Sequence, residues 1–317
     1  MGLNVAIQMD PIDRIDIDAD STFALALEAQ RRGHDLCHYL ASDLCLAKGR
    51  ILAKARPLAV RRVKGDHFTL GDFQWIDLAQ VDIVLMRQDP PFDMAYITAT
   101  HLLQHVHPRT LVINDPVEVR NAPEKLFVAH FPELMPPTLI ASDREQILAF
   151  RAEHKEIIVK PLFGNGGAGV FHILPEDDNL NALLELFTVL YREPVVVQRY
   201  LPEVRDGDKR IILIDGRAAG AITRVPAKGE ARANLHVGGK ALATTLTSRE
   251  EEICAAIGPE LKSRGLVFVG IDVIGGFLTE INVTSPTGIQ EIGRFDDVSL
   301  EAQLWDAFED RFHASRV

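Results

Sequence analysis

The sequence predicts an α/β protein that begins with a parallel sheet covered by helices. Short apolar runs of strand length alternate with helical patterns through the first third of the chain, and this alternation is typical of parallel sheets with both faces buried. The chain has 317 residues, of which 47% are hydrophobic and 25% charged. That length suits about two globular domains, and three small ones are also compatible with it. A change of composition near residue 121 predicts a domain boundary there.

The apolar runs of the first third predict strands, and the patterns between them predict helices. Strands are expected at residues 4–8, 34–40, 82–87 and 110–114. Between the first two, Ser21 is a suitable helix N-cap and Gly33 a suitable C-terminal stop. In such sheets ligands bind beyond the carboxyl ends of the strands, and these ends carry Asp10, Arg87 and Asn114.

A second series of elements is expected after the boundary. Asn121, followed by Glu124 three residues later, predicts a helix start and a helix over residues 125–131. Further helices are expected at residues 143–154, 180–191 and 248–264. Further strands are expected at residues 157–161, 170–174, 195–200 and 210–214, and two more around a Gly-Gly turn within residues 269–282.

Charge and cysteine content exclude several classes of function. The formal net charge of −11 repels phosphate backbones, so a nucleic-acid partner is not expected. The three cysteines include no CxxC pair, which argues against a disulfide framework or a zinc site. No apolar run has the length of a membrane span, and the first residues do not resemble a signal peptide. We therefore expect a cytoplasmic protein without a membrane partner.

The strongest local motif follows Lys160-Pro161 and has four glycines in the six residues 164–169. Glycine lets the backbone approach a phosphate closely and direct N–H groups at its oxygens. The segment lacks the Gly-Lys-Ser/Thr of a Walker A loop, and a strand instead of a helix follows it. It therefore predicts a flap over a nucleotide, with Lys160 at its base reaching phosphate oxygens. The alternative is an ordinary hairpin tip.

Three oxygen-bearing side chains, Asp272, Glu280 and Asn282, lie within apolar strands. Ionised carboxylates are rarely found there unless they are paired or bound to a metal. Glu280 and Asn282 share one face because side chains alternate along a strand. Asp272 joins that face only if the turn has an odd number of residues. A Mg²⁺ site therefore requires Asp272 to lie opposite Glu280, and a salt-bridged carboxylate pair is the alternative.

Basic residues surround these motifs. Arg210 opens an apolar strand, and Arg224, Arg232 and Lys240 lie in or beside a polar glycine-containing stretch, residues 227–239. Each alone would ordinarily be a solvated surface charge. On an acidic chain, however, basic residues near a glycine-rich and carboxylate-bearing site become candidates for binding anionic substrates. The hydroxyl and N–H groups of residues 284–288 could hold a carboxylate or simply form a turn.

At these residues the chain resembles the ATP-grasp ligases, and among them the bacterial glutathione synthetases. The matching segments are Met9-Asp10-Pro11 and residues 85–93, 124–127, 160–169, 206–210 and 278–287. The flap and the metal strand are general to ATP-grasp proteins, whereas the Arg-x-Asp-Pro-Pro-Phe-Asp and Asn-Val-Thr-Ser-Pro-Thr runs are more specific. The resemblance implies a Rossmann-like parallel-sheet domain, residues 1–121, followed by a two-lobed ATP-grasp fold. That fold would have a lid subdomain, residues 122–201, and a C-terminal subdomain with the metal site, residues 202–317.

The resemblance also implies residue roles. The residues implied for ATP are Lys125, Lys160, Gly164, Asn165, Gly166, Gly167, Ala168, Gln198, Arg199, Tyr200, Leu201 and Asp208. Those implied for Mg²⁺ or Mn²⁺ are Asp272, Glu280 and Asn282. Those implied for γ-glutamylcysteine and glycine are Arg87, Arg210, Arg224, Ser285 and Thr287. The implied catalytic residues are Lys160, Arg210, Arg224 and Arg232, the last in a loop that shuts the site.

The implied reaction is the ATP-dependent ligation of γ-glutamylcysteine and glycine to glutathione, through an acyl phosphate, with release of ADP and phosphate. The chain shows no Ser/His/Asp or Cys/His constellation, and this reaction needs no protein nucleophile. A homotetramer or homodimer is implied as well. The chain departs from some relatives at Gly288 and in the closing loop. The alternatives are another ATP-grasp carboxylate-amine ligase or a non-catalytic nucleotide-binding regulator. A dehydrogenase is weakly supported because no GxGxxG follows the first strand.

Overall fold

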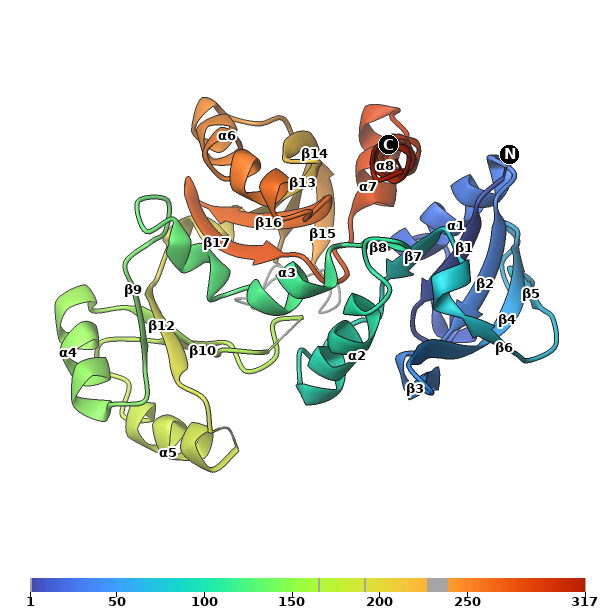
Figure 1. Cartoon of the computed structure of the whole chain (residues 1–317). Coiled ribbons are helices and arrows are strands. Elements are labelled where there is room, and N and C mark those ends of the chain that lie inside the picture. The colour runs from blue at the N-terminus through green and yellow to red at the C-terminus, as the bar shows by residue number, and fades with distance from the viewer. Residues whose placement is uncertain (1, 165, 191, 227–238, 317) are drawn as a thin grey trace.

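A computed structural model describes residues 2–164, 166–190, 192–226 and 239–316. The described residues form three sheets that follow one another along the chain (Figure 1). The core of the first sheet is parallel, as expected: β2 and β7 flank β1, and β8 pairs with β7. These strands are β1 (Asn4–Gln8), β2 (Asp35–Tyr39), β7 (Ile83–Met86) and β8 (Leu111–Ile113). All four strand predictions of the first third are therefore confirmed.

The first sheet also has an antiparallel extension that the sequence analysis did not anticipate. Its long strand β4 pairs antiparallel with β2 and carries the other three strands. The extension consists of β3 (Leu44–Ala47), β4 (Arg50–Val60), β5 (Phe68–Leu70) and β6 (Gln74–Asp77). Buried and exposed side chains alternate along much of β4, as expected where one face of an antiparallel sheet meets water. The sheet is thus mixed.

Helix starts in this part differ from two expectations. Asp20, not Ser21, caps α1 (Ser21–Arg31), and its side chain accepts from the backbone N–H of Phe23. Asn121 ends α3 (Pro116–Asn121) instead of starting a helix, because Asp115 caps that helix and Pro116 opens it. The expected helix over residues 125–131 is only a short 3₁₀ turn, η4 (Phe127–His130). The remaining helix is α2 (Met94–Gln104).

The second sheet is antiparallel and carries the glycine-rich flap. Its order is β11-β10-β12-β9, and the flap joins β10 to β11. The strands are β9 (Thr138–Ala141), β10 (Ile157–Pro161), β11 (Phe171–Ile173) and β12 (Val195–Arg199). The helices α4 (Arg144–His154) and α5 (Leu180–Leu190) share one apolar core with these strands. The strand-flap-strand prediction is confirmed.

The third sheet is also antiparallel and has the order β15-β14-β13-β16-β17. Its strands are β13 (Asp208–Ile214), β14 (Arg217–Val225), β15 (Lys240–Ala243), β16 (Phe268–Ile274) and β17 (Phe277–Asn282). The helix α6 (Ser248–Ser263) packs against it, with Thr247 and Glu250 forming a capping box. Further short 3₁₀ turns are Ile12–Arg14, Ala41–Asp43, Leu78–Gln80 and Pro202–Arg205.

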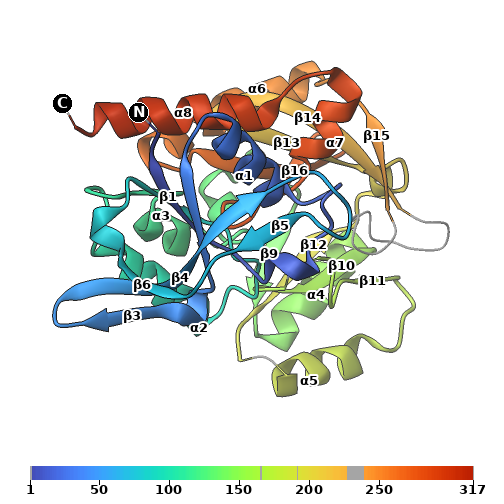
Figure 2. The ribbon, with the colours of Figure 1, turned by 90° about the vertical axis from the view of Figure 1, so that its right-hand side faces the viewer.

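The last two helices, α7 (Ile289–Asp296) and α8 (Leu300–Ala314), were not anticipated. α8 packs against α1 of the first sheet (Figure 2). The indole N–H of Trp305 donates to the carbonyl of Leu25 at 2.8 Å, and Trp305 and Phe308 are fully buried in a core that includes Phe23. The two ends of the chain therefore share one hydrophobic core. No helix of the described residues is long and apolar enough to cross a membrane.

Candidate active site

A cavity of about 930 Å³ lies where the three sheets meet, and it is large enough for substantial small-molecule ligands. Nearly all the residues predicted for the site line it. They are Arg87, Lys125, Lys160, Gly164, Gly166, Gly167, Ala168, Gln198, Arg199, Tyr200, Leu201, Asp208, Arg210, Arg224, Asp272, Glu280, Asn282, Ser285 and Thr287. Asn165 and Arg232 lie outside the described residues.

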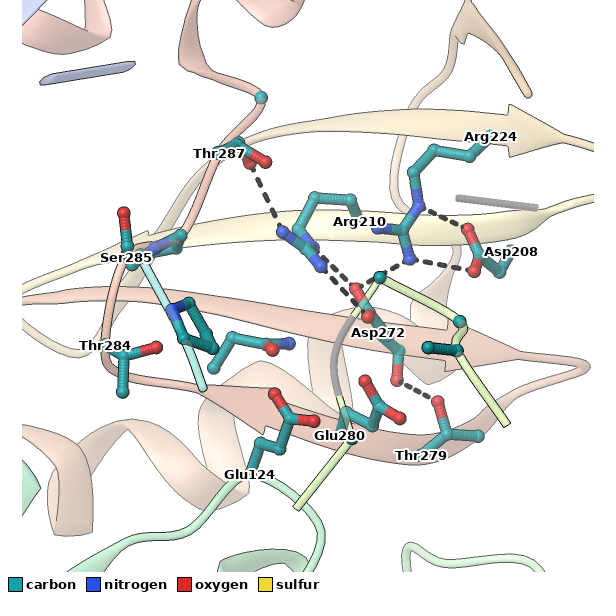
Figure 3. A pocket seen from close by; sticks show the side chains of 18 of the residues that line it. Glu124, Asp208, Arg210, Arg224, Asp272, Thr279, Glu280, Thr284, Ser285 and Thr287 are labelled. Atoms are coloured by element: carbon teal, nitrogen blue, oxygen red, sulfur yellow. Dashed lines mark hydrogen bonds and ion pairs between the residues drawn. The ribbon is translucent and has the colours of Figure 1, made fainter. Parts of the chain in front are cut away.

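Strand register places a row of charged side chains across the third sheet. Asp208 lies opposite Arg224, and Arg210 lies opposite Asp272. Asp272 in turn lies opposite Glu280. Because directly opposed residues on one face are near neighbours, this register alone brings the five side chains together. Figure 3 shows the two guanidinium groups converging on Asp272.

The arginines and aspartates of this row form a buried ion-pair network. Arg210 binds Asp272 through two bonds, of 2.5 and 3.0 Å. Arg224 binds Asp208 at 2.5 and 2.8 Å, and its Nη2 also lies 3.0 Å from Asp272 Oδ1. Burial raises the pKa of the Asp272 carboxyl, but the two guanidinium groups outweigh it, and the net pKa is lowered. Burial prevails at Asp208, whose pKa is raised despite Arg224.

The hairpin between β16 and β17 satisfies the register that a metal site requires, though by a different route from the expected one. The turn has two residues, Gly275 and Gly276, both with positive φ, so the stated condition, that Asp272 joins this face only through an odd-numbered turn, was wrong. Such a turn alone would put Asp272 and Glu280 on opposite faces. An irregularity at Thr279 adds one residue to β17, and Asp272 therefore pairs with Glu280.

Two buried lysines approach Glu280 from the flap side. Lys160 Nζ lies 3.3 Å and Lys125 Nζ 3.8 Å from Glu280 Oε1. Lys125 also contacts the Glu124 carboxylate and donates to the carbonyl of Gly164 in the flap. Burial lowers the pKa of Lys160, although Glu280 opposes this effect. At Lys125 the neighbouring carboxylates outweigh burial, and its pKa is raised. Positive charge is thus held at the base of the flap.

The segment from Gln198 to Leu201 forms another wall of the cavity. Gln198 Nε2 donates to the hydroxyl of Thr138 at 3.0 Å, which fixes its amide. The ring of Tyr200 stacks on His172, with centroids 3.9 Å apart. These contacts leave a wall of mixed polar and aromatic character next to the flap.

Arg87 joins the first sheet to the third at the other end of the cavity. It is buried, its Nε donates to Thr22 Oγ1 at 3.1 Å, and its Nη2 donates to the carbonyl of Pro286 at 2.9 Å. Ser285 donates back to the carbonyl of Arg87 at 3.3 Å. Burial lowers the pKa of Arg87. The guanidinium position is therefore set by contacts from α1 and from the loop after β17.

Of the three strand-end residues singled out from sequence, Asp10 and Arg87 line the cavity, whereas Asn114 does not. The Asn114 amide donates to the carbonyls of Phe268 and Val283 at 2.8 and 2.7 Å. Its oxygen accepts from the N–H groups of Val267 and Phe268. Asn114 therefore connects β8 to the third sheet and has a structural role.

The predicted cation site offers oxygen donors alone. Within the described part of the chain, no three His, Cys, Asp or Glu side chains are arranged to hold a metal ion. Asp272 and Glu280 must therefore be completed by the amide of Asn282, whose buried Nδ2 has no hydrogen-bond partner and so leaves the amide unlocked. Burial, with nearby Glu280, raises the pKa of Glu124 to about 7. Glu124, Asp272 and Glu280 thus bring together carboxylate oxygens, the ligand type that a hard divalent cation takes. In this structure the same carboxylates are paired with Lys125, Lys160, Arg210 and Arg224, so the salt-bridged arrangement considered as the alternative is also present.

Several lining residues were not predicted from the sequence. Glu124 was considered as part of a helix start and of the matching segment 124–127, but was given no role in the site, although its position beside Lys125 was a usable signal. The others come from the loops and helix starts next to the first sheet, from β17 and from α7: Arg14, Asp16, Asp20, Ser21, Asp89, Thr279 and Glu291. Their approach depends on how the sheets pack together, which no local pattern reveals.

Family models and known proteins match nearly the whole of this chain. Residues 3–120 match the prokaryotic glutathione synthetase N-terminal domain, and residues 124–297 match the prokaryotic glutathione synthetase ATP-grasp domain. The glutathione synthetase of Brucella melitensis is 58% identical over 98% of this chain and 100% of its own. That of Rhodopseudomonas palustris is 58% identical over 98% and 99%. The solved structure of the ATP-grasp ligase PsnB, complexed with a precursor peptide and AMPPNP, covers 98% of both chains. It has a TM-score of 0.63 at 18% identity, which confirms the predicted fold.

Proposed function

The chain belongs to the prokaryotic glutathione synthetase family and catalyses ATP-dependent glutathione synthesis, and we propose that the reaction takes place in the cavity where its three sheets meet. One observation carries this proposal. Two buried lysines, two buried arginines and the carboxylates that hold them converge under a glycine-rich flap. Such a site can bind phosphates and carboxylates together, as joining two acids through an amide requires.

The carboxylate of γ-glutamylcysteine must first be activated, because oxide is a poor leaving group. The γ-phosphoryl group of ATP is transferred to this carboxylate, which gives an acyl phosphate and ADP. The amine of glycine then attacks the acyl carbon, the C–O bond to phosphate breaks, and the amine loses a proton. Lys125 and Lys160 stabilise the phosphate oxygens as charge moves between them.

The flap excludes water during these steps, because water would hydrolyse the acyl phosphate. Gly164, Gly166, Gly167 and Ala168 line the cavity, and the carbonyl of Gly164 is bound by Lys125. Asn165 is assigned to ATP binding with the rest of the flap, and Arg232 to the loop that shuts the site. The wall from Gln198 to Leu201 is assigned to the adenine base, and Asp208 to the ribose.

Arg210 and Arg224 are assigned to the carboxylates of the two substrates and to the oxyanion of the reacting carbonyl. Asp208 and Asp272 already hold these guanidinium groups in place, so little reorganisation is needed when substrate binds. Arg87, Ser285 and Thr287 are assigned to the dipeptide. Asp272, Glu280 and Asn282 would hold Mg²⁺ or Mn²⁺, which when bound neutralises charge on the phosphate oxygens.

Three units are proposed within the chain: residues 1–121, 122–201 and 202–317. The three-sheet topology and the match boundaries at residues 120 and 124 support this division. A homotetramer or homodimer and a cytoplasmic location are further proposals, supported by the family resemblance.

The test is a component-omission experiment with purified protein. ADP release and glutathione mass are measured with Mg²⁺-ATP, γ-glutamylcysteine and glycine, and then with each component left out. We expect both products only in the complete mixture. Release of ADP with a different product would favour another carboxylate-amine ligase, and ATP binding without turnover would favour a non-catalytic nucleotide-binding protein.

A further inference from the structure

Besides Asn282 Nδ2 in the proposed cation site, two buried polar atoms in the wall of the cavity have no hydrogen-bond partner. They are Ser21 Oγ and Glu291 Oε2, in side chains whose residues are 1% and 7% exposed. Both residues line the cavity. Buried polar groups are nearly always satisfied, so each such exception requires an explanation. The most direct explanation is a ligand that donates hydrogen bonds to both atoms.

The fold brings these two residues to one corner of the cavity. The side chain of Gln290, beside Glu291, donates to the carbonyls of Ile17 and Asp20 at 3.1 and 2.6 Å. This ties the first turn of α7 to the segment that precedes Ser21. Asp20 itself also lines the cavity. The corner therefore carries two carboxylates and a hydroxyl, all three able to accept hydrogen bonds.

The Asp20 carboxylate lies in surroundings that disfavour a lone negative charge. Burial raises its pKa, although the nearby Arg87 opposes this effect, and the charge of Asp89 raises it further. Arg87 is held beside it through Thr22, the neighbour of Ser21. A cation in this corner would be stabilised by the carboxylates, and a carboxylate next to it by Arg87. That pair of complementary charges matches a free α-amino acid group, in which one carbon carries both an ammonium and a carboxylate group.

Only one of the three substrates presents an ammonium group that must stay charged. ATP has none, and the amine of glycine must be unprotonated to attack, so a pair of carboxylates around it would oppose the reaction. The glutamyl residue of γ-glutamylcysteine is joined through its side chain and therefore keeps both its α-ammonium and its α-carboxylate, far from the reacting carboxyl group.

We propose that Glu291, Asp20 and Ser21 bind the α-ammonium group of the γ-glutamyl residue, so that this corner selects γ-linked dipeptides. The inference rests on the proposed function and identifies the part of the site that recognises the end of the dipeptide remote from the chemistry. It makes Glu291 a specificity-determining residue.

The test pairs a variant with a substrate that lacks the group in question. Glutarylcysteine is γ-glutamylcysteine without its α-amino group. The wild-type enzyme should use it with a lower kcat/KM, by about ten- to a hundredfold, because a charged hydrogen-bond partner is lost. Glu291→Gln should lower kcat/KM for γ-glutamylcysteine by a similar factor and leave that for glutarylcysteine within about twofold. Ser21→Ala should show the same pattern with a smaller loss.

Asp296→Asn is the matched control, because it removes an acidic charge from an exposed position of the same helix. It should leave kcat/KM unchanged for both γ-glutamylcysteine and glutarylcysteine. An equal loss on both substrates in Glu291→Gln would mean a structural role and would overturn the proposal, as would no loss on either. Failure of the wild-type enzyme to make glutathione would overturn the proposed function instead, so the two failures are distinguishable.

Discussion

Asp272 is the residue on which most of the charged network depends. It is 4% exposed and accepts from both Arg210 and Arg224. Burying each guanidinium group costs hydration free energy, and a carboxylate opposite the group offsets this cost. Asp272 therefore has two tasks, because it also belongs to the proposed cation site.

The substitution Asp272→Asn should lower both activity and stability. It keeps the shape of the side chain but leaves two buried guanidinium groups with less compensating charge, at a cost of about 3–5 kcal/mol in unfolding free energy. Urea unfolding at neutral pH measures this loss. Asp206→Asn, at an exposed position two residues before β13, is the control and should unfold like the wild-type protein. A stable Asp272→Asn protein would show that the network contributes little to folding.

At the scale of elements, the flap gives a second prediction. Gly166 has φ +61° with open space where a Cβ would be, so Gly166→Ala introduces backbone strain of about 1–2 kcal/mol without a clash. Because Gly166 lines the cavity, the KM for ATP should rise by about tenfold.

A matched glycine separates strain from function in this experiment. Gly49 has φ +74° and equally open space, but it lies in the β3–β4 hairpin and does not line the cavity. Gly49→Ala should lose similar stability and keep the wild-type KM. If both variants bind ATP normally, the flap does not need its glycines for nucleotide binding.

The elements also show how far sequence reasoning reached. Local patterns predicted three strands of the second sheet (β10, β11 and β12) and the flap, because apolar run length and glycine content are local signals, but β9 was missed. The pairing of Asp272 with Glu280 was stated as a requirement, but the two-residue turn and the irregularity at Thr279 were not foreseen. The ion pairs from Arg210 and Arg224 depend on register between strands far apart in sequence. α8 and the antiparallel strands around β4 were missed because their apolar faces are completed only by tertiary packing.

At the scale of the whole molecule, α8 packs between the first sheet with its helix α1 and the third sheet. Phe308→Ala should lower the unfolding free energy by about 3–5 kcal/mol, because it leaves a cavity in the shared core. Phe295→Ala, at a half-exposed position on α7, is the control and should cost far less. Denaturant unfolding of the two variants measures the difference. Equal effects would contradict a shared core at this interface.

The same interface predicts a dependence of stability on pH. Burial lowers the pKa of His34, although Glu309, 3.0 Å away, opposes this effect. In the unfolded chain, a histidine with an ordinary pKa near 6.5 binds a proton that the folded protein excludes. The unfolding free energy should therefore fall as pH drops through about 6.5. Urea unfolding at pH 7.5 and 5.5 measures this fall, and His34→Asn should reduce it. An unchanged slope in the variant would assign the effect to other groups.

The packing of α8 has a consequence for the synthesis of this chain. Asp82 accepts from the backbone N–H of Asn4 with one oxygen and from Arg316 with the other, at 2.9 Å each, so the first strand and the last residues meet on one carboxylate. Domains usually fold from the N-terminus while the chain is still being made. Here the apolar surface of α1 stays uncovered until α8 leaves the ribosome. The apolar face of α1 is therefore open to chaperones and to aggregation until α8 has been made.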